Sequence, residues 1–502
     1  MRKNKLLISS FTITVVAASF VLFSNFALAG SVPFFGQESP GVDETEESGD
    51  YFGSILASGD FDGDGCSDLA TGNPFEDVGG SQDAGLIQIF WCPDIANADF
   101  SDDTVYHQDS PGWPGANEDY DRLGNALAVG DFNNDGYDDL AVASAREDLG
   151  SKTNAGMVTV AYGSSSGSLG SFQTIHQGQS NIVGASEPFD YFGYSLAAGD
   201  LNGDGYDDLV IGAPYEDIGS IKNAGSISIL YGSDTKLRTD NDQFFSQNTA
   251  GVNGGAEDGD SFGRSLAIGD VNGDGFGDVI IGVPYEDIGS IQRCGMIQIL
   301  WGSNTRVSSA GDIDYHQDKP GIPGVCEAND RFGTSLSAGD IGTDGKADIA
   351  IGIPYEKVGS IVDAGWVLII HSTGSYQSIN QGSPGVIGAL ETGDRFGQQV
   401  LLVDFTDDDS ADLIVGTIGE DIGSIRNVGV VHTFESDNET ISSVNDKTFF
   451  PGSSRLPGTT SPDGYFGYFH AITYLETSSH IFAGDEGGLT SDNGGSIYYF
   501  QP

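Results

Sequence analysis

Apolar and polar residues alternate along this chain in short runs that glycine-rich turns separate. One stretch begins with Ser195–Asp200 (SLAAGD), passes through an acidic loop into Asp208–Pro214 (DLVIGAP), and reaches Gly225–Gly232 (GSISILYG). The alternation in the last run is typical of a half-buried strand, whereas the small and β-branched residues of the second fit a strand buried on both faces. The runs are too short and too often interrupted by glycine for helices, so we expect an all-β chain.

A fourth short run completes the pattern and ends near a glutamine, as in Thr104–Gln108 (TVYHQ). The set of four runs recurs about every 70 residues, and each copy opens with a Phe-Gly or Leu-Gly pair. These pairs are Phe52-Gly53, Leu123-Gly124, Phe192-Gly193, Phe262-Gly263, Phe332-Gly333, Phe396-Gly397 and Phe466-Gly467. Seven units of four antiparallel strands predict a seven-bladed β-propeller, and a solenoid is the alternative.

The two ends of the repeat array complement each other. The last copy ends after its third run, at Gly495–Pro502 (GSIYYFQP), and has no fourth. Near the start of the chain, Val32–Gln37 (VPFFGQ) resembles an isolated fourth run. We expect this N-terminal strand to join the last blade and close the ring, because closure removes an unpaired strand edge. An open solenoid gives no reason for such complementary ends.

Acidic loops join the first and second runs of the first six copies. In the first loop, Asp60–Asp68 (DFDGDGCSD), carboxylates occupy positions 1, 3, 5 and 9, and Gly65 occupies position 6. This is the order of an EF-hand loop through position 9, and a donor set of oxygens without His or Cys favours calcium over zinc. Solvated Asp-Gly turns held by Asx hydrogen bonds are the alternative, although the recurrence in phase argues against it.

The loops differ in their candidate calcium ligands. Loops two to four carry asparagine at position 3, loop five carries Gly342 there, and loop six has Asp409 in place of the glycine at position 6. We therefore expect about four strong calcium sites and two weaker ones, and none in the seventh copy. The candidate ligands are Asp60, Asp62, Asp64, Asp68, Asp131, Asn133, Asp135, Asp139, Asp200, Asn202, Asp204, Asp208, Asp270, Asn272, Asp274, Asp278, Asp340, Asp344, Asp348, Asp404, Thr406, Asp408 and Asp412.

The balance of charge restricts the partners of the protein. The 502 residues include 20 Lys and Arg against 74 Asp and Glu, which gives a formal net charge of −54. Phosphate backbones are repelled by such a charge, so nucleic acid is not expected as a partner. Adaptation to a saline habitat would explain the acidity as well as a cationic partner does.

The first residues have the features of an export signal. A basic start and an apolar stretch precede Ala27-Leu28-Ala29, a small-x-small cleavage site. We expect residues 1–29 to be a signal peptide and residues 30–502 to form a single propeller, with no membrane span in the mature chain. An uncleaved membrane anchor is the alternative. The expected location is secreted, periplasmic or at the cell surface.

The recurring motifs resemble a known repeat. A Phe-Gly pair, a DxDGDGxxD-type loop and Gly212-Ala213-Pro214 or its variants together resemble FG-GAP repeats, which build the seven-bladed propeller of integrin alpha subunits. The resemblance covers nearly the whole mature chain. It implies calcium bound by the acidic loops on the lower face, ligand contacts from the upper-face loops, and a role in adhesion. The chain lacks the inserted adhesion domain, legs and membrane helix of integrins, so an integrin-like heterodimer is not implied.

The four cysteines are Cys66, Cys92, Cys294 and Cys326. With strands of alternating direction in a propeller of this kind, the first two lie on the lower face and the last two on the upper face. The pairing Cys66–Cys92 and Cys294–Cys326 is one of three possible pairings, and it keeps partners on the same face. Four free buried thiols are the alternative.

A second acidic set follows the second run of each copy, on the expected upper face. We interpret these acids as turn-capping residues, with a cation-bridged or basic-ligand surface as the alternative. The sequence favours a secreted calcium-binding module for adhesion to, or binding of, an extracellular protein or glycan, rather than an enzyme. A hydrolase or lyase that uses upper-face acids on a carbohydrate or similar substrate is the alternative. The acids are Glu76, Glu147, Glu216, Glu286, Glu356 and Glu420.

Overall fold

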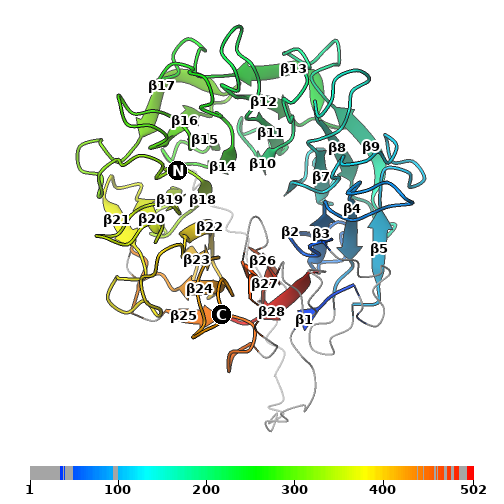
Figure 1. Cartoon of the computed structure of the whole chain (residues 1–502). Coiled ribbons are helices and arrows are strands. Elements are labelled where there is room, and N and C mark those ends of the chain that lie inside the picture. Colours follow the sequence, from blue (N-terminus) through cyan, green and yellow to red (C-terminus); the bar gives the residue numbers. More distant parts are fainter. Residues whose placement is uncertain are drawn as a thin grey trace, which may run out of the picture. The chain divides into compact units, whose positions relative to one another are not determined.

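The strands of the computed structural model form seven four-stranded antiparallel sheets in a ring, as Figure 1 shows. The structure describes residues 34–37, 39, 49–93, 100–437, 439–444, 446–456, 460, 462–467, 472–475, 480–485 and 495–502. Within this part all 28 elements are strands, so the predicted all-β, seven-bladed propeller is confirmed. The expected signal peptide, residues 1–29, lies outside the described residues.

Blades one to six take their strands in sequence order from the centre of the ring outward, and the seventh does so for its first three strands (Figure 1). The innermost strands are β2 (Ile55–Gly59), β6 (Leu127–Gly130), β10 (Ser195–Gly199), β14 (Ser265–Gly269), β18 (Ser335–Gly339), β22 (Phe396–Val403) and β26 (Ile472–Leu475). The second strands are β3 (Asp68–Asn73), β7 (Asp139–Ser144), β11 (Asp208–Ala213), β15 (Asp278–Val283), β19 (Asp348–Ile353), β23 (Asp412–Thr417) and β27 (His480–Asp485).

The outer half of each blade follows the same order. The third strands are β4 (Leu86–Phe90), β8 (Met157–Tyr162), β12 (Ser226–Tyr231), β16 (Met296–Trp301), β20 (Trp366–Ile370), β24 (Val430–Phe434) and β28 (Ser496–Phe500). The outermost strands are β5 (Asp103–Tyr106), β9 (Gly170–Ile175), β13 (Arg238–Phe245), β17 (Ser308–Tyr315), β21 (Tyr376–Ile379), β25 (Lys447–Phe449) and β1 (Phe34–Phe35).

The N-terminal strand closes the ring, as the sequence predicts. Strand β1 pairs antiparallel with β28, with Phe34 opposite Tyr498 and Phe35 opposite Ile497. The last sheet therefore has the order β1-β28-β27-β26, and its outermost strand comes from the opposite end of the chain. This pairing rules out the solenoid, because a solenoid leaves the two terminal units apart.

Burial follows the sequence prediction for the second strands but not for the third. Every residue of β11 is buried, as expected for a strand rich in β-branched residues. Every residue of β12 is buried as well, so the predicted half-buried third strand is wrong, because neighbouring blades cover both of its faces. The core lies between neighbouring blades: Val210 and Ile229 of blade three share one hydrophobic cluster with Val279 of blade four. No blade buries its second and third strands without the next blade, so the ring is stable only as a whole.

The two glycine motifs meet at each junction between blades. A Cβ atom on Gly212 of the second strand would lie 2.2 Å from the carbonyl oxygen of Gly263, which belongs to the next Phe-Gly pair. Gly263 itself has φ +82°, a conformation that other residues rarely adopt. The neighbouring ring of Phe262 is fully buried. The glycines thus allow consecutive backbones to touch while the phenylalanine fills the space beside them.

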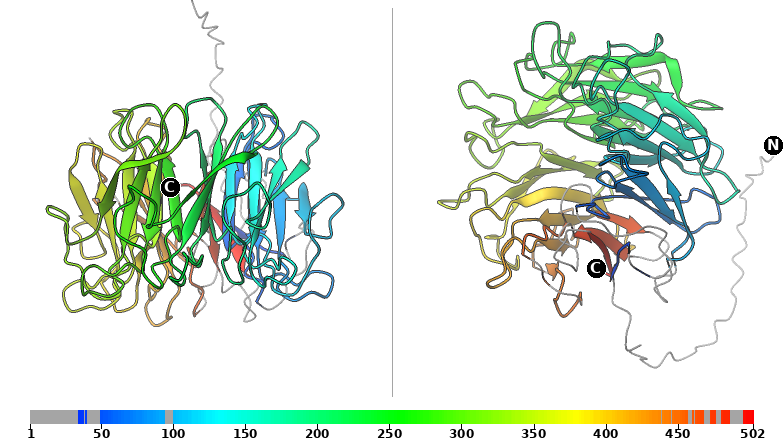
Figure 2. Two further views of the ribbon diagram at one scale, coloured as in Figure 1. Left: turned by 90° about the horizontal axis from the view of Figure 1, so that it is seen from above. Right: turned by 45° about the vertical axis from the view of Figure 1, so that its right-hand side comes forward.

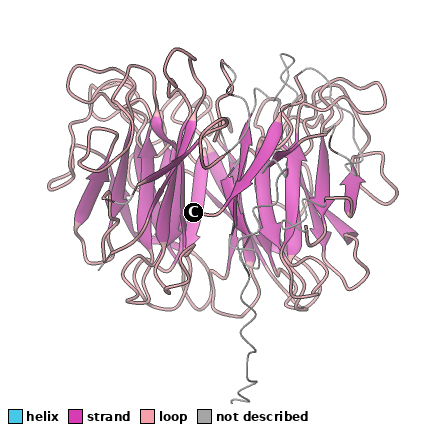
Figure 3. Cartoon of the chain, turned by 90° about the horizontal axis from the view of Figure 1, so that it is seen from below, coloured by secondary structure: helices cyan, strands magenta, loops and turns pink. Residues whose placement is uncertain are grey.

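Loops gather at the two faces of the ring (Figures 2 and 3). Antiparallel strands place the acidic loops on one face, which we call the lower face, and the second-to-third and blade-to-blade loops on the other, the upper face. Disulfides join Cys66 to Cys92 and Cys294 to Cys326, so the predicted pairing is confirmed. Among the described residues, no helix has the length and apolarity that crossing a membrane requires.

Loss of the closing aromatic contact should destabilise the propeller. The ring of Phe35 is 2% exposed and stacks on Phe100 with ring centroids 3.8 Å apart. Phe35→Ala should lower the free energy of unfolding by about 3–5 kcal/mol, because it leaves a cavity at the ring closure. The matched control is Phe189→Ala, at a side chain 51% exposed, and urea unfolding should show little change for it. Equal losses in the two variants would contradict the proposed closure.

Candidate metal centres

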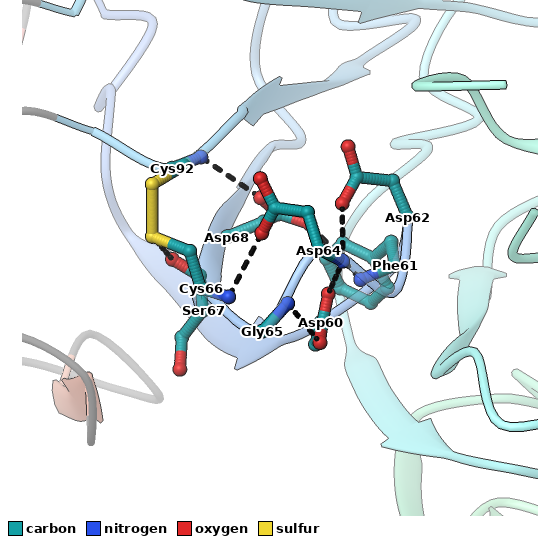
Figure 4. The surroundings of a disulfide bond; sticks show 9 residues. All are labelled: Asp60, Phe61, Asp62, Asp64, Gly65, Cys66, Ser67, Asp68 and Cys92. Atoms are coloured by element: carbon teal, nitrogen blue, oxygen red, sulfur yellow. Dashed lines mark hydrogen bonds between the residues drawn. A yellow bond between two sulfur atoms is a disulfide. The ribbon is translucent and has the colours of Figure 1, made fainter. Parts of the chain in front are cut away.

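The first acidic loop brings three carboxylates together between β2 and β3 (Figure 4). One oxygen atom each of Asp60, Asp62 and Asp68 lies within 4.8 Å of the others. Calcium binds oxygens at about 2.3–2.6 Å, so two ligands of one ion lie within about twice that distance of each other. The spacing of these carboxylates therefore fits a bound calcium ion.

The backbone of the loop turns the carboxylates inward. The N–H groups of Asp64 and Gly65 donate to the two carboxylate oxygens of Asp60, each at 3.0 Å. Gly65 has φ +85°, which lets the chain bend back over the first aspartate. These are Asx-type hydrogen bonds, so the backbone amides of the loop itself hold the turn. A bound cation would offset the electrostatic repulsion between the converging carboxylates.

The same geometry recurs around the ring. In each of the other five acidic loops, the amide at position 6 donates to the aspartate at position 1. These bonds run from Gly136 to Asp131 (2.9 Å), Gly205 to Asp200 (2.9 Å), Gly275 to Asp270 (2.8 Å), Gly345 to Asp340 (2.7 Å) and Asp409 to Asp404 (2.8 Å). Loop six keeps the bond although Asp409 must adopt φ +68°, which is strained for a residue other than glycine.

Position 9 anchors each loop to the blade. Asp68 accepts from the N–H of Phe61 (2.9 Å) within the loop and from that of Cys92 (2.8 Å) beyond the third strand. Burial raises the pKa of Asp68 to about 7 and that of Asp139 and Asp208 to about 8. A divalent cation beside these groups would favour their ionised form and reverse this effect.

Position 8, which the sequence did not single out, links neighbouring loops. The N–H of Asp60 donates to Asp138 of the second loop (2.8 Å), and the N–H of Asp131 donates to Asp207 of the third (3.0 Å). The first three candidate sites are therefore joined in series on the lower face. Asp60 and Asp131, the first residues of loops one and two, thus belong to a candidate metal site and also bind the next blade.

The loops are not equivalent as metal sites. Within the described part of the chain, only loop one gathers three carboxylates. The other loops have an amide, a hydroxyl or no side chain at position 3, and Thr406 of loop six donates its hydroxyl to Asp412 (3.1 Å). A calcium ion in loops two to four would take the amide oxygen of asparagine there, and in loop five it would lack that ligand.

The upper-face glutamates pair with glutamines of the preceding blade. Each glutamine lies at the end of an outermost strand and donates its side-chain amide to the glutamate that follows the next blade's second strand. The pairs are Gln37–Glu76 (2.6 Å), Gln108–Glu147 (2.5 Å), Gln177–Glu216 (2.8 Å), Gln247–Glu286 (2.7 Å), Gln317–Glu356 (2.7 Å) and Gln381–Glu420 (2.5 Å). The glutamates therefore link blades, which supports their structural interpretation.

Burial also changes the acidity of these glutamates. It raises the pKa of Glu147, Glu216, Glu286 and Glu356 to about 8 and that of Glu420 to about 7. The terminal glutamine of each fourth run was visible in the sequence, but only the fold brings it to the glutamate 39 positions further along the chain.

Comparisons with known proteins agree with this architecture. The FG-GAP repeat matches at residues 52–90, 123–160, 192–230, 262–295 and 332–369. Phosphatidylinositol-glycan-specific phospholipase D of Rattus norvegicus is 28% identical over 77% of this chain and 46% of its own length. The same enzyme of Dictyostelium discoideum is 31% identical over 49% of this chain and 27% of its own. Integrin alpha-8 of Mus musculus is 29% identical over 48% of this chain and 21% of its own. The chain thus spans less than half of each of these relatives.

The buried glutamates should make stability depend on pH. The pKa of Glu216 rises from about 4.3 in the unfolded chain to about 8 in the folded protein. This glutamate therefore stabilises the fold at a pH below about 4.3, and its contribution is lost as the pH rises to about 8. Glu216→Gln keeps an acceptor for Gln177 and removes the titration. The variant should match the wild type at pH 5 and exceed it by roughly 1–4 kcal/mol at pH 8.

Thermal melting from pH 5 to pH 8 measures this difference. The control is Asp234→Asn, at an exposed aspartate after β12, and this variant should have nearly the wild-type melting temperature at both pH values. A Glu216→Gln difference that does not grow with pH would contradict the assignment.

Proposed function

Because this chain is an FG-GAP repeat β-propeller similar to those of integrin alpha subunits, we propose that it is a secreted, calcium-stabilised module that binds an extracellular protein or glycan. The convergence of Asp60, Asp62 and Asp68 in a loop pattern that recurs in six blades carries the calcium part of this proposal. Two disulfides suit an oxidising, extracellular compartment.

Calcium at these positions would act on structure. The loops lie on the lower face, and the first three are joined to one another by the bonds from Asp60 to Asp138 and from Asp131 to Asp207. An ion that neutralises one loop therefore also supports the contact with the next blade. Extracellular sites of this type bind calcium at about 10⁻⁴–10⁻³ M, a range typical of a structural ion in a calcium-rich medium.

The upper-face acids support a binding module over the alternative hydrolase or lyase. Each of Glu76, Glu147, Glu216, Glu286, Glu356 and Glu420 accepts from a buried glutamine. A general acid or base must face its substrate, whereas these side chains are buried between blades. Trp91 and Trp113 are 8% and 6% exposed and belong to the hydrophobic core, so neither offers an open aromatic face to a sugar.

Removal of calcium should destabilise the protein. With about 10 mM calcium and the affinities above, each occupied site should add about 1.4–2.7 kcal/mol to the free energy of unfolding. A chelator should therefore lower the melting temperature by several degrees, and excess calcium should restore it. A melting temperature that is the same in chelator and in calcium would refute the calcium-stabilised part of the proposal.

The fifth loop offers a gain-of-function test. Gly342→Asp supplies the missing ligand at position 3, and a Cβ atom there meets only the side chain of Glu439 at 3.4 Å and the side chain of Asp340. Calorimetric titration should show tighter calcium binding by this variant. Gly255→Asp, at an open position outside the acidic loops, adds the same charge as a control and should leave the titration unchanged. Equal effects of both variants would show that charge alone, without the loop geometry, explains the binding.

A further inference from the structure

Arginines and aromatic residues gather at the upper ends of the innermost strands, which face the centre of the ring in Figure 1. They occupy the positions just before and just after each Phe-Gly pair and just after each second strand. We call this set the collar. It contains five of the chain's eleven arginines: Arg122, Arg146, Arg264, Arg331 and Arg395.

Blades three to six fill their part of the collar with stacked side chains. Arg264 lies between the rings of Tyr194 (4.8 Å) and Tyr285 (5.1 Å), and Arg331 lies over Tyr355 at 4.1 Å. The distances join guanidinium carbons to ring centroids. Arg264 and Arg331 each have more than one aromatic ring as a neighbour, and Arg395 has the ring of Tyr355 at 5.1 Å. Aromatic faces stabilise a cation without an acidic partner.

Blades one to three leave a cavity of about 410 Å³ in the same collar. Arg122 and Arg146 line it, together with Phe75, Asn125, Tyr191 and Tyr215. Each of the two arginines contacts a single ring here, Arg122 over Phe75 at 4.3 Å and Arg146 over Tyr191 at 5.7 Å. Their guanidinium groups therefore border open space.

Of the two guanidinium groups at this cavity, one has an ion pair within the described part of the chain. Among the described residues, Arg122 is the one collar arginine with an ion pair, to Asp83 at 3.2 Å. Burial, together with the positive charge of Arg146, lowers the pKa of Arg122, which shows that the two guanidinium groups repel each other. A chain with 74 acidic residues thus keeps Arg146 without a carboxylate partner beside a cavity.

We propose that this cavity binds an acidic sugar at the end of a glycan, with its anionic group at Arg146 and Arg122 and its ring against Tyr191 and Tyr215. Arginine recognises carboxylates and sulfates through paired charge-assisted hydrogen bonds. A sugar ring has apolar C–H faces and hydroxyl groups at its edges. The tyrosine rings can stack on the C–H faces, and the tyrosine hydroxyls and the side-chain amide of Asn125 can bind the sugar hydroxyls.

The net charge of the protein favours one acid group over a polyanion. At −54, the field of the whole chain opposes the approach of long anionic polymers, whereas a single acid group can reach two local guanidinium groups at short range. The inference rests on the proposed ligand-binding function and specifies its ligand class and position.

Calorimetric titration of the full-length, calcium-saturated protein tests the proposal with three probes. Galacturonic acid presents one carboxylate, galactose 6-sulfate presents one sulfate, and neutral galactose presents neither. At least one acidic probe should bind ten or more times as tightly as the neutral one, and the probe that binds identifies the acid group. Equal affinity for the neutral sugar, or no binding of either acidic probe, would overturn the proposal.

Variants then locate the site. Arg146→Gln should weaken binding of the acidic probe ten-fold or more, because it removes a charge-assisted pair. Arg238→Gln is the matched control, since Arg238 lies on the outermost strand β13 and pairs with Asp240 at 3.2 Å. Unchanged binding by Arg146→Gln, or an equal loss in Arg238→Gln, would refute this location.

An array of glycans and extracellular proteins separates failure of this inference from failure of the proposed function. Ligands bound equally by the wild type and Arg146→Gln would uphold the binding module and refute the collar site. A wild type that binds nothing on the array and none of the three probes would refute both.

Discussion

The contact between consecutive blades determines how this protein holds together. Each second strand is buried on both faces, and its neighbour across one of them is the next blade. The approach is so close that a Cβ atom on Gly212 would lie 2.2 Å from the carbonyl oxygen of Gly263, well inside van der Waals contact. Any mismatch in this spacing would accumulate around the ring, since seven blades must close on the strand that β1 supplies.

The polar links at the two faces follow from the same constraint. On the lower face, amides of one acidic loop donate to an aspartate of the next; on the upper face, a buried glutamine donates to the glutamate of the next blade. Burial raises the pKa of Asp207 in the lower links and of Glu216 in the upper links, because the ionised form loses its hydration. The lower face contains additional carboxylates that can be compensated by calcium, whereas the upper links depend on neutral amide donors. We infer that metal removal acts on the lower face, whereas a change of pH acts on both faces, because burial also raises the pKa of Asp139 and Asp208.

The sequence predicts what is repeated and misses what is particular to single blades. The ring, the closing strand and the disulfide pairs follow from period and strand direction, and all three are confirmed. The contact of Asp138 with the preceding blade and that of Gln177 with the next blade depend on the distance between blades, which the repeat period does not give. The collar was missed for another reason: Arg264 follows a Phe-Gly pair whereas Arg331 precedes one, so alignment of the repeats places them in different columns.

The backbone before each Phe-Gly pair gives an independent reason to regard the collar as selected for its side chains. All seven residues at this position have φ between 49° and 61°, in the left-handed region, and none is glycine. Glycine would adopt this conformation without strain, whereas another residue costs about 1 kcal/mol or more. The chain nevertheless places Tyr51, Arg122, Tyr191, Arg331 and Arg395 at five of these positions. Stacking of Arg331 on Tyr355 offsets the strain in the filled part of the collar. Beside the cavity, Arg122 has one aromatic neighbour and an ion pair at a half-exposed aspartate, so a bound anion would supply the remaining stabilisation.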